Sequence, residues 1–335
     1  ICASTSARQV VRSCFDSLLR STQDRIQPPL AFPMKLPLIP LGVGVALRRA
    51  GVSKDTPRRM FLFAFFGCQM PIVLFAVWAA RISEGAKYLP LMALAGWLVA
   101  AGVGRLASGV MGHAPRQRGA FVVSMALSNN GYTLVGLISL VLFGQEGIAQ
   151  ATWTQMMAVP FLVFFCFPLG RFYGSGKGRM PLRDVILGTL KDPRSLPIIA
   201  MIAGLSLQLA DVPRPAWCAK ALPLLVYLGT VATGAAVGFL LTRFHPRHFL
   251  RENVFSFVWR STLFPLLFLL MARLAGLNHM DTCILLLFGL VPSALFATMV
   301  ANFFDLDTDL TGSMFFIGTM LFVLLVLPVY VAVVT

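Results

Sequence analysis

Long apolar segments follow one another along almost the whole chain, separated by short polar and basic connections. Ten of them stand out, at approximately 30–48, 60–80, 88–110, 119–142, 151–171, 195–211, 219–241, 253–275, 281–301 and 312–334. A helix of about 20 apolar residues is long enough to cross the hydrocarbon layer of a membrane. The pattern therefore predicts an all-α integral membrane protein with ten transmembrane helices.

A long basic connection at 172–194 divides the ten segments into five and five. An odd number of crossings in each half gives the halves opposite orientations, which is the inverted-repeat organisation of many secondary transporters. We therefore expect a first repeat over 30–171, a linker over 172–194 and a second repeat over 195–335. Residues 1–29 precede the first segment. Within them, the spacing at 7–26 fits an amphipathic helix on a membrane surface, and a disordered tail from a misassigned start fits equally.

The distribution of charge gives the expected orientation. The net charge is +15, but the basic residues form short clusters between apolar segments and no continuous face, which disfavours nucleic acid as a partner. Connections after segments one, three, five and seven carry seventeen Lys and Arg residues, against five after segments two, four, six and eight. The positive-inside rule then places the first set in the cytoplasm. We expect a multi-pass protein of the cell membrane with both termini outside.

The fourth apolar segment contains a polar interruption near its middle, made of Ser128, Asn129, Asn130, Gly131, Tyr132 and Thr133. Asn competes with the backbone for hydrogen bonds, and Gly costs about 1 kcal/mol relative to Ala inside a helix. The interruption predicts an unwound stretch whose polar groups face the protein interior, because lipid cannot satisfy them. A helix that restarts after such a break has a positive N-terminus suited to an anion.

The ninth segment is interrupted at a corresponding place by Gly289, Pro292 and Ser293. Proline inside a helix costs about 3 kcal/mol, because it removes a hydrogen bond and clashes with the preceding turn. Either interruption alone fits an ordinary kink. The matched pair predicts a crossover near the membrane midplane that binds the substrate, with Gly131, Gly136, Gly289 and Pro292 as hinge positions.

Arg260 lies within the eighth segment, toward its expected cytoplasmic end. A charge at the centre of the membrane costs roughly 2.5–3.5 kcal/mol on insertion scales, and less near an interface. Three roles are open: pairing with a substrate carboxylate, reaching lipid phosphate, or binding carbonyls of a neighbouring helix. The last two, structural roles are together favoured.

Other chemistry has little support in the sequence. The six cysteines lack CxxC spacing, and the four histidines form no ligand set, so we expect no metal and no cofactor. Paired carboxylates and a Ser–His arrangement at membrane depth are missing, which disfavours an enzyme. No Asp or Glu falls squarely inside a segment, which disfavours tight proton or sodium coupling through side chains. Sodium bound by carbonyls at the two breaks stays open.

Several stretches, taken in order, carry a resemblance to a known family. They are LGVGVALRRAGV (41–52), QMPIVLF (69–75), NNGYTLVGLISLVLFGQEGIAQA (129–151), KDPRSLPIIAMIAGL (191–205) and VPSALFATMVANFFDLDTDLTGSMFFIGTMLFVLLVLPVY (291–330). The series covers nearly everything after residue 36 and resembles the auxin efflux carrier family of membrane transport proteins, in its bacterial branch. Two departures stand out. Ile138 takes the place of a usual proline, and 228–240 lacks the family's proline.

The resemblance implies a carrier in which a scaffold domain and a transport domain alternate access to the two sides, exporting a small organic anion such as auxin or a dicarboxylate. The expected substrate-binding residues are Asn129, Asn130, Gly131, Tyr132, Thr133, Pro292, Ser293 and Arg260. Membrane lipid is the expected surrounding, and a homodimer is left open. The alternatives are a sodium-coupled symporter of the related bile acid–sodium symporter architecture, and a channel or non-transporting sensor on the same fold.

Overall fold

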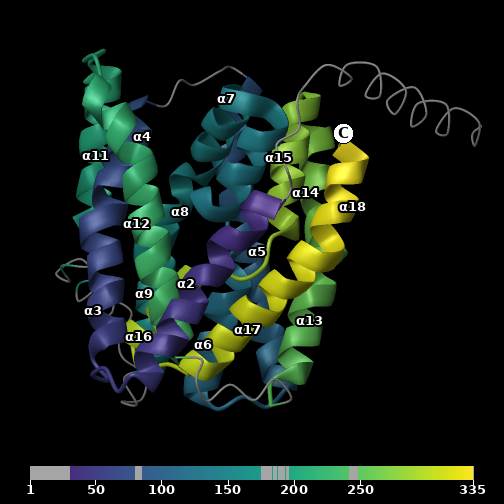
Figure 1. Cartoon of the computed structure of the whole chain (residues 1–335). Helices are drawn as coiled ribbons and strands as arrows, with labels where there is room; N and C mark the ends of the chain where they lie inside the picture. Colours follow the sequence, from purple (N-terminus) through teal and green to yellow (C-terminus); the bar gives the residue numbers. More distant parts are fainter. Residues whose placement is uncertain are drawn as a thin grey trace, which may run out of the picture.

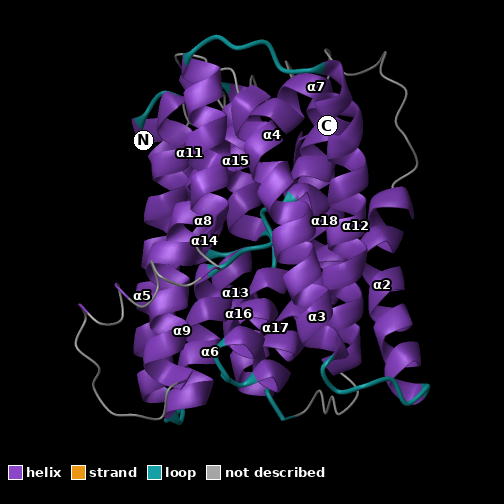
Figure 2. Cartoon of the chain, turned by 90° about the vertical axis from the view of Figure 1, so that its left-hand side faces the viewer, coloured by secondary structure: helices purple, strands orange, loops and turns teal. Residues whose placement is uncertain are grey.

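The computed structural model describes residues 31–79, 85–174, 196–240 and 248–334, together with Arg183, Leu187 and Pro193. The expected tail over 1–29, including 7–26, and most of the linker over 172–194 lie outside the described residues. The described part of the chain is almost entirely helical, with a single isolated β-bridge and no longer strand (Figure 2). The all-α prediction is confirmed.

Helices in the first half occupy the places of its predicted apolar segments (Figure 1). Their bounds are α2 (Ala31–Arg49), α3 (Thr56–Leu62), η1 (Phe63–Gln69), α4 (Met70–Ala79), η2 (Gly85–Tyr88), α5 (Leu89–Val110), α6 (Pro115–Ala126), η3 (Tyr132–Gly136), α7 (Leu137–Thr154), η4 (Gln155–Met157), α8 (Ala158–Phe161), η5 (Leu162–Cys166) and α9 (Phe167–Gly174). The connection expected between segments four and five is helical in the structure, apart from Gly144, whose φ of 67° interrupts α7.

The second half follows the predicted segments in the same way. It consists of α11 (Leu196–Leu209), α12 (Ala216–Leu240), α13 (Leu250–Ser261), α14 (Leu263–Leu274), α15 (His279–Leu290), α16 (Leu295–Phe303), α17 (Thr308–Leu321), η8 (Phe322–Val326) and α18 (Leu327–Val334). The eighth segment, expected to be continuous, is broken at Thr262, where φ is −127° and ψ is −82°.

Six helices are long and apolar enough to cross a membrane, judged by length and composition: Thr56–Ala79, Leu89–Val110, Ala149–Gly174, Ala216–Leu240, Leu250–Leu274 and Thr308–Val334. Large apolar side chains on the outer surface, among them Leu106, Leu209 and Leu274, are well exposed. An outer surface of this kind suits lipid and not water. Together these features indicate a membrane-embedded protein.

The helices pack as two groups. We call α2, α3–α4, α11 and α12 the panel group, and the helices of 85–174 and 248–334 the crossover group. Within the panel group α12 packs along α2 and α3, and α11 packs along α4; pairs that join the two groups have fewer contacts. Figure 1 shows α3, α4, α11 and α12 together on one side of the bundle, with α2 running diagonally in front of it. Each group takes segments from both halves of the chain.

Three helical rods contain a wide π-helical turn, and each of these turns ends two residues before a proline. Segment η1 precedes Pro71, η5 precedes Pro168 and η8 precedes Pro328. A proline lacks the N–H of the normal helical hydrogen bond and its ring clashes with the carbonyl one turn earlier. The wider turn before it makes room for the ring, so that the rods continue across the interruption.

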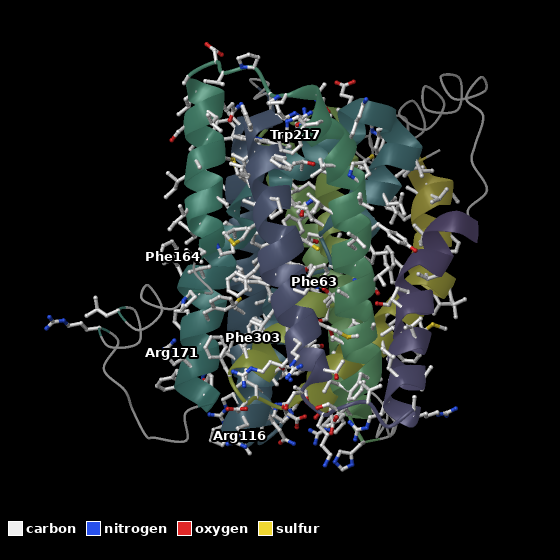
Figure 3. All side chains as sticks on the ribbon, turned by 60° about the vertical axis from the view of Figure 1, so that its left-hand side comes forward. Phe63, Arg116, Phe164, Arg171, Trp217 and Phe303 are labelled. Atoms are coloured by element: carbon white, nitrogen blue, oxygen red, sulfur yellow. The ribbon has the colours of Figure 1, made fainter. Side chains whose placement is uncertain are left out.

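The two ends of the bundle differ. Arg116 and Arg171 lie toward one end, whereas Trp217 lies toward the opposite end (Figure 3). At the first of these ends, His113 Nε2 contacts Glu252 Oε1 at 2.9 Å and joins the α5–α6 turn to α13. Arg116 and Arg171, from two connections that the charge pattern assigns to the same side of the membrane, thus lie toward the same end of the bundle.

Glycine allows the closest approach within the panel group, and this gives a first prediction. A Cβ at Gly44 of α2 would overlap the backbone of α12 at Ala235 and Phe239, whereas Gly42 has nothing within 4 Å. We expect Gly44→Ala to cost about 1–3 kcal/mol, because α2 must move away from α12. This should lower the melting temperature of the purified protein by several degrees.

Gly42→Ala is the matched control. It adds the same methyl group to the same helix in open space, so its melting temperature should equal or exceed that of the parent. Equal melting of the two variants would show that α2 and α12 do not pack at this distance.

Candidate functional site at a helix crossover

Both predicted interruptions are true breaks in the helices. After α6 the chain leaves the helix at Leu127, with ψ of 111°, and reaches Gly131, with ψ of 176°, before helix resumes at Tyr132. Between them Asn130 donates its backbone N–H to the Ser128 carbonyl at 2.7 Å in a tight turn. After α15 it is extended from Val291, with ψ of 147°, to Ala294, with ψ of 150°, and α16 follows. Each predicted segment therefore consists of two shorter helices joined by an extended stretch.

The two extended stretches cross and bind each other. Asn129 donates its backbone N–H to the carbonyl of Pro292 at 2.8 Å, and Ala294 donates its own to the carbonyl of Leu127 at 2.9 Å. These bonds form an antiparallel bridge between Ser128 and Ser293. Backbone groups that have lost their helical partners at the breaks thus find partners across the crossing, as a water-free interior requires.

The helix after the first break restarts with a wide turn. Gly131 accepts hydrogen bonds through its carbonyl from the N–H groups of Leu134 at 3.3 Å and Gly136 at 3.2 Å. This π-helical turn, η3, ends two residues before Ile138, the same spacing that separates the other three wide turns from a proline. The wide turn therefore forms here without a proline.

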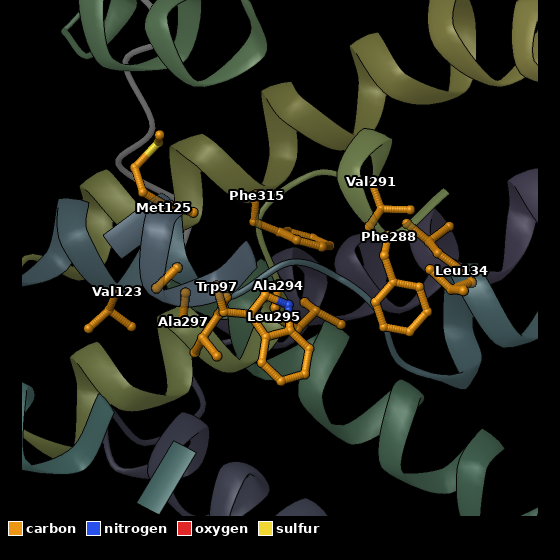
Figure 4. Packing of buried hydrophobic residues seen from close by; sticks show 14 of the residues in the cluster. Trp97, Val123, Met125, Leu134, Phe288, Val291, Ala294, Leu295, Ala297 and Phe315 are labelled. Atoms are coloured by element: carbon orange, nitrogen blue, oxygen red, sulfur yellow. The ribbon is translucent and has the colours of Figure 1, made fainter. Parts of the chain in front are cut away.

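A cavity of about 130 Å³ lies against the crossover, on the boundary between the two helix groups. Panel residues on one side are Ala64, Cys68, Gln69, Ile72, Val226, Gly229, Thr230 and Thr233. Crossover-group residues on the other are Trp97, Leu127, Ser128, Asn129, Asn130, Gly131, Gln155, Ala158, Val159, Leu162, Ala294, Leu295 and Phe296. Figure 4 shows Trp97 beside Ala294 and Leu295, where the second break passes the first. Both extended stretches therefore form part of one wall.

The cavity wall is mostly apolar, with a few polar groups. Asn130 Oδ1 and Gln155 Nε2 are buried without a hydrogen-bond partner within the described structure. Thr230 and Thr233 donate their hydroxyl hydrogens to carbonyls of their own helix at 2.7 Å, which leaves their oxygens as acceptors. The N-terminal turn of α16 also borders the cavity at Leu295 and Phe296, where backbone N–H groups have no intrahelical partner. No Asp, Glu, Lys or Arg is among the described lining residues.

Arg260 lies on the other side of the crossover, away from this cavity. Its guanidinium donates to backbone carbonyls of both interrupted segments, and Nη1 also donates to Ser128 Oγ. Together with Pro292 and Ser293 it borders a second, small cavity of about 10 Å³. The structure thus shows Arg260 bonded to carbonyls of neighbouring helices, one of the roles that the sequence leaves open.

The predicted site residues do not all lie together. Asn129, Asn130 and Gly131 line the large cavity, whereas Pro292, Ser293 and Arg260 border the small one. Of the other hinge positions, Gly136 ends the wide turn η3, and Gly289 lets α14 approach, since a Cβ there would lie 2.8 Å from Pro265 Cα. The side chains of Tyr132 and Thr133 lie outside the described residues.

Sequence reasoning missed four polar residues of the cavity wall. Gln69, Gln155, Thr230 and Thr233 come from helices η1, η4 and α12, far from either break in sequence. The available signal was weak: a polar side chain in an apolar segment, and for the two threonines a spacing that puts both on one helix face. Only the packing of the two groups brings them together.

Comparison of the sequence with models of known protein families and with curated proteins finds no match. Among the described residues no three His, Cys, Asp or Glu side chains lie close enough together to hold a metal ion. The interpretation of the site therefore depends on its own geometry.

The bridge between the breaks can be tested at one hydrogen bond. Ala294 has a φ of −76°, which a proline adopts, but proline has no N–H to donate to the Leu127 carbonyl. We expect Ala294→Pro to destabilise the protein by about 1–3 kcal/mol, because the buried Leu127 carbonyl loses its short hydrogen bond and keeps only the 3.4 Å bond from Arg260 Nη2. Melting of the purified protein in detergent measures the effect.

Ala294→Gly keeps the N–H group and is the control. It should change the melting temperature much less, because glycine is well tolerated where a helix begins. A proline variant as stable as the glycine variant would mean that this bond contributes little to the crossover.

Proposed function

We propose that the protein is a secondary transporter of a small organic anion, that it works by alternating access, and that its substrate binds at the crossover. The observation that carries the proposal is the position of the 130 Å³ cavity, between two helix groups and against both interrupted segments. A binding site on a boundary is exposed to one side or the other when one group moves against its neighbour, which is how many secondary carriers work.

The membership of the two groups supports the ten-crossing inverted repeat. The panel group takes segments one, two, six and seven, and the crossover group takes three, four, five, eight, nine and ten. Equivalent segments of the two halves therefore lie in the same group. In this interpretation the panel group is the scaffold domain and the crossover group is the transport domain.

The electrostatics of the wall favour an anion. Helix N-termini at α16 and at the restart after Gly131 carry partial positive charge, and free N–H groups at the first of them border the cavity. A cation would meet no carboxylate among the described lining residues. The apolar remainder suits the carbon skeleton of an organic acid. We therefore assign the carboxylate to the N-terminal turn of α16, with the Asn130 carboxamide turned so that its N–H group donates to it, and the body of the substrate to the apolar wall.

The position of Arg116 and Arg171 toward one end of the bundle agrees with the expected orientation, with that end in the cytoplasm and both termini outside the cell membrane. We propose transport from the cytoplasm outward. Of the alternatives, the sodium symporter is less well supported, because Arg260 binds carbonyls at the breaks that a sodium ion would use. A channel or sensor differs from a carrier in its flux, which can be measured.

Asn130 provides the sharpest test of the site. The melting temperatures of the purified parent and of the Asn130→Ala variant should be measured in the presence of mono- and dicarboxylates, aromatic acids and sodium. We expect at least one anion to raise the melting temperature of the parent, and Asn130→Ala to weaken its binding about 10- to 100-fold through loss of a hydrogen bond to a charged group. Asn302→Ala, which removes a carboxamide of α16 that does not line the cavity, should keep the response.

A parent that no anion stabilises, or an Asn130→Ala variant that responds like the parent, would reject this site. Measurements of anion flux in proteoliposomes then distinguish a carrier from a channel. Saturable uptake that an internal substrate accelerates indicates a carrier, and conductance that does not saturate indicates a channel.

A further inference from the structure

We propose that the Arg260 guanidinium is a built-in cation of the crossover, which takes the place that a bound metal cation would otherwise fill and so assembles the substrate site without sodium. The consequence for transport, a cycle that needs no sodium, rests on the proposed function. The assembly of the crossover does not, and it can be tested without any substrate.

Two helix C-termini converge on the place that Arg260 occupies. Helix α6 ends at Ala126 and α15 ends at Leu290, and the last carbonyls of each lack intrahelical partners. A helix C-terminus carries about half a unit of negative charge, so two of them provide about one unit. One positive charge balances that total, and the single guanidinium supplies it.

The hydrogen bonds show that this cation joins both segments. On the α6 side Nη2 donates to the carbonyls of Ser124 at 3.0 Å, Met125 at 2.8 Å and Leu127 at 3.4 Å. On the α15 side Nη1 donates to the carbonyl of Val291 at 3.1 Å. These are contacts with main-chain oxygens, the ligands that an alkali or alkaline-earth cation would also use. The planar, forked guanidinium reaches both segments with two nitrogens, Nη1 and Nη2, a geometry that the single ammonium group of a lysine does not reproduce.

Arg260 itself is held firmly and out of water. It lies in the last turn of α13, its side chain is 3% exposed, and its guanidinium carbon is 5.8 Å from the centre of the Phe264 ring. Within the described residues it forms no ion pair. A buried charge without a carboxylate partner needs other compensation, and here it comes from the carbonyls. The guanidinium and the two helix ends therefore stabilise each other.

The test compares melting temperatures of the purified, substrate-free protein in sodium, potassium and choline chloride at equal ionic strength. The parent should melt at the same temperature in all three salts. Arg260→Ala should melt about 5–10 °C lower, because it leaves the carbonyls of two helix ends without a partner. Low-millimolar guanidinium should restore part of this loss in Arg260→Ala by entering the vacated space, and should not stabilise the parent.

Two further variants control the result. Arg273→Ala removes an exposed arginine from the last turn of α14, so it should melt like the parent and show no response to guanidinium. Arg260→Lys keeps the charge but loses the fork, so it should melt between the parent and Arg260→Ala. If Arg260→Ala cannot be purified, the lysine variant and the salt series on the parent still decide the question.

Selective stabilisation of the parent by sodium would overturn the proposal, and so would Arg260→Ala or Arg260→Lys melting like the parent. Because no substrate is added, these melting experiments test the crossover alone. Failure of the protein to bind anions would reject the proposed function without affecting their result. Conversely, a sodium requirement in flux together with a sodium-independent crossover would place the coupling ion elsewhere in the protein.

Discussion

Backbone polar groups at the crossover that face away from the large cavity must find partners inside the protein, because lipid and apolar side chains provide none. Two helices interrupted at the same depth would leave carbonyls exposed at two ends and N–H groups exposed at two others. The chain meets this constraint by crossing the extended stretches, so that Leu127 and Asn129 bond to Ala294 and Pro292. The carbonyls of Ser124, Met125 and Val291 bind Arg260. Without these bonds neither break would be tolerated.

The same constraint makes the two faces of the crossover different. On one face the helix C-termini and the guanidinium neutralise each other around a cavity of about 10 Å³, the size of roughly one water molecule. On the other face the N-terminal turn of α16 borders the large cavity with N–H groups that no side chain caps. The partial positive charge of the α16 N-terminus is thus uncompensated at the large cavity, where a ligand has room. At the small cavity, which has no room for a ligand, the charges of the helix ends and Arg260 balance. This asymmetry follows from the direction of the chain at each break.

Much of this arrangement could be predicted from local sequence. The run from Asn129 to Gly131 and the combination of Gly289, Pro292 and Ser293 each disfavour helix, so both breaks were predictable. A single proline is a weaker signal, because Pro71, Pro168 and Pro328 each follow a wide turn within a continuous rod. The break at Thr262 was not predictable from its neighbours. The nearest helix-breaking residue is Pro265, and prolines elsewhere in the chain stand in the first turn of intact helices. The partners of Arg260 and the polar wall from α12 depend on contacts between segments distant in sequence, which no local pattern contains.

Packing within the groups bears on how such a protein moves. Gly234 and Gly238 of α12 lie directly against Pro40 and Leu41 of α2, so the panel group is held by close backbone contacts that resist sliding. The crossover group is held by the bridge and by Arg260, both internal to it. A shift at the boundary therefore breaks none of the bonds that define either group. Such a shift would change only the set of neighbours around the cavity, which is what the proposed alternating access requires.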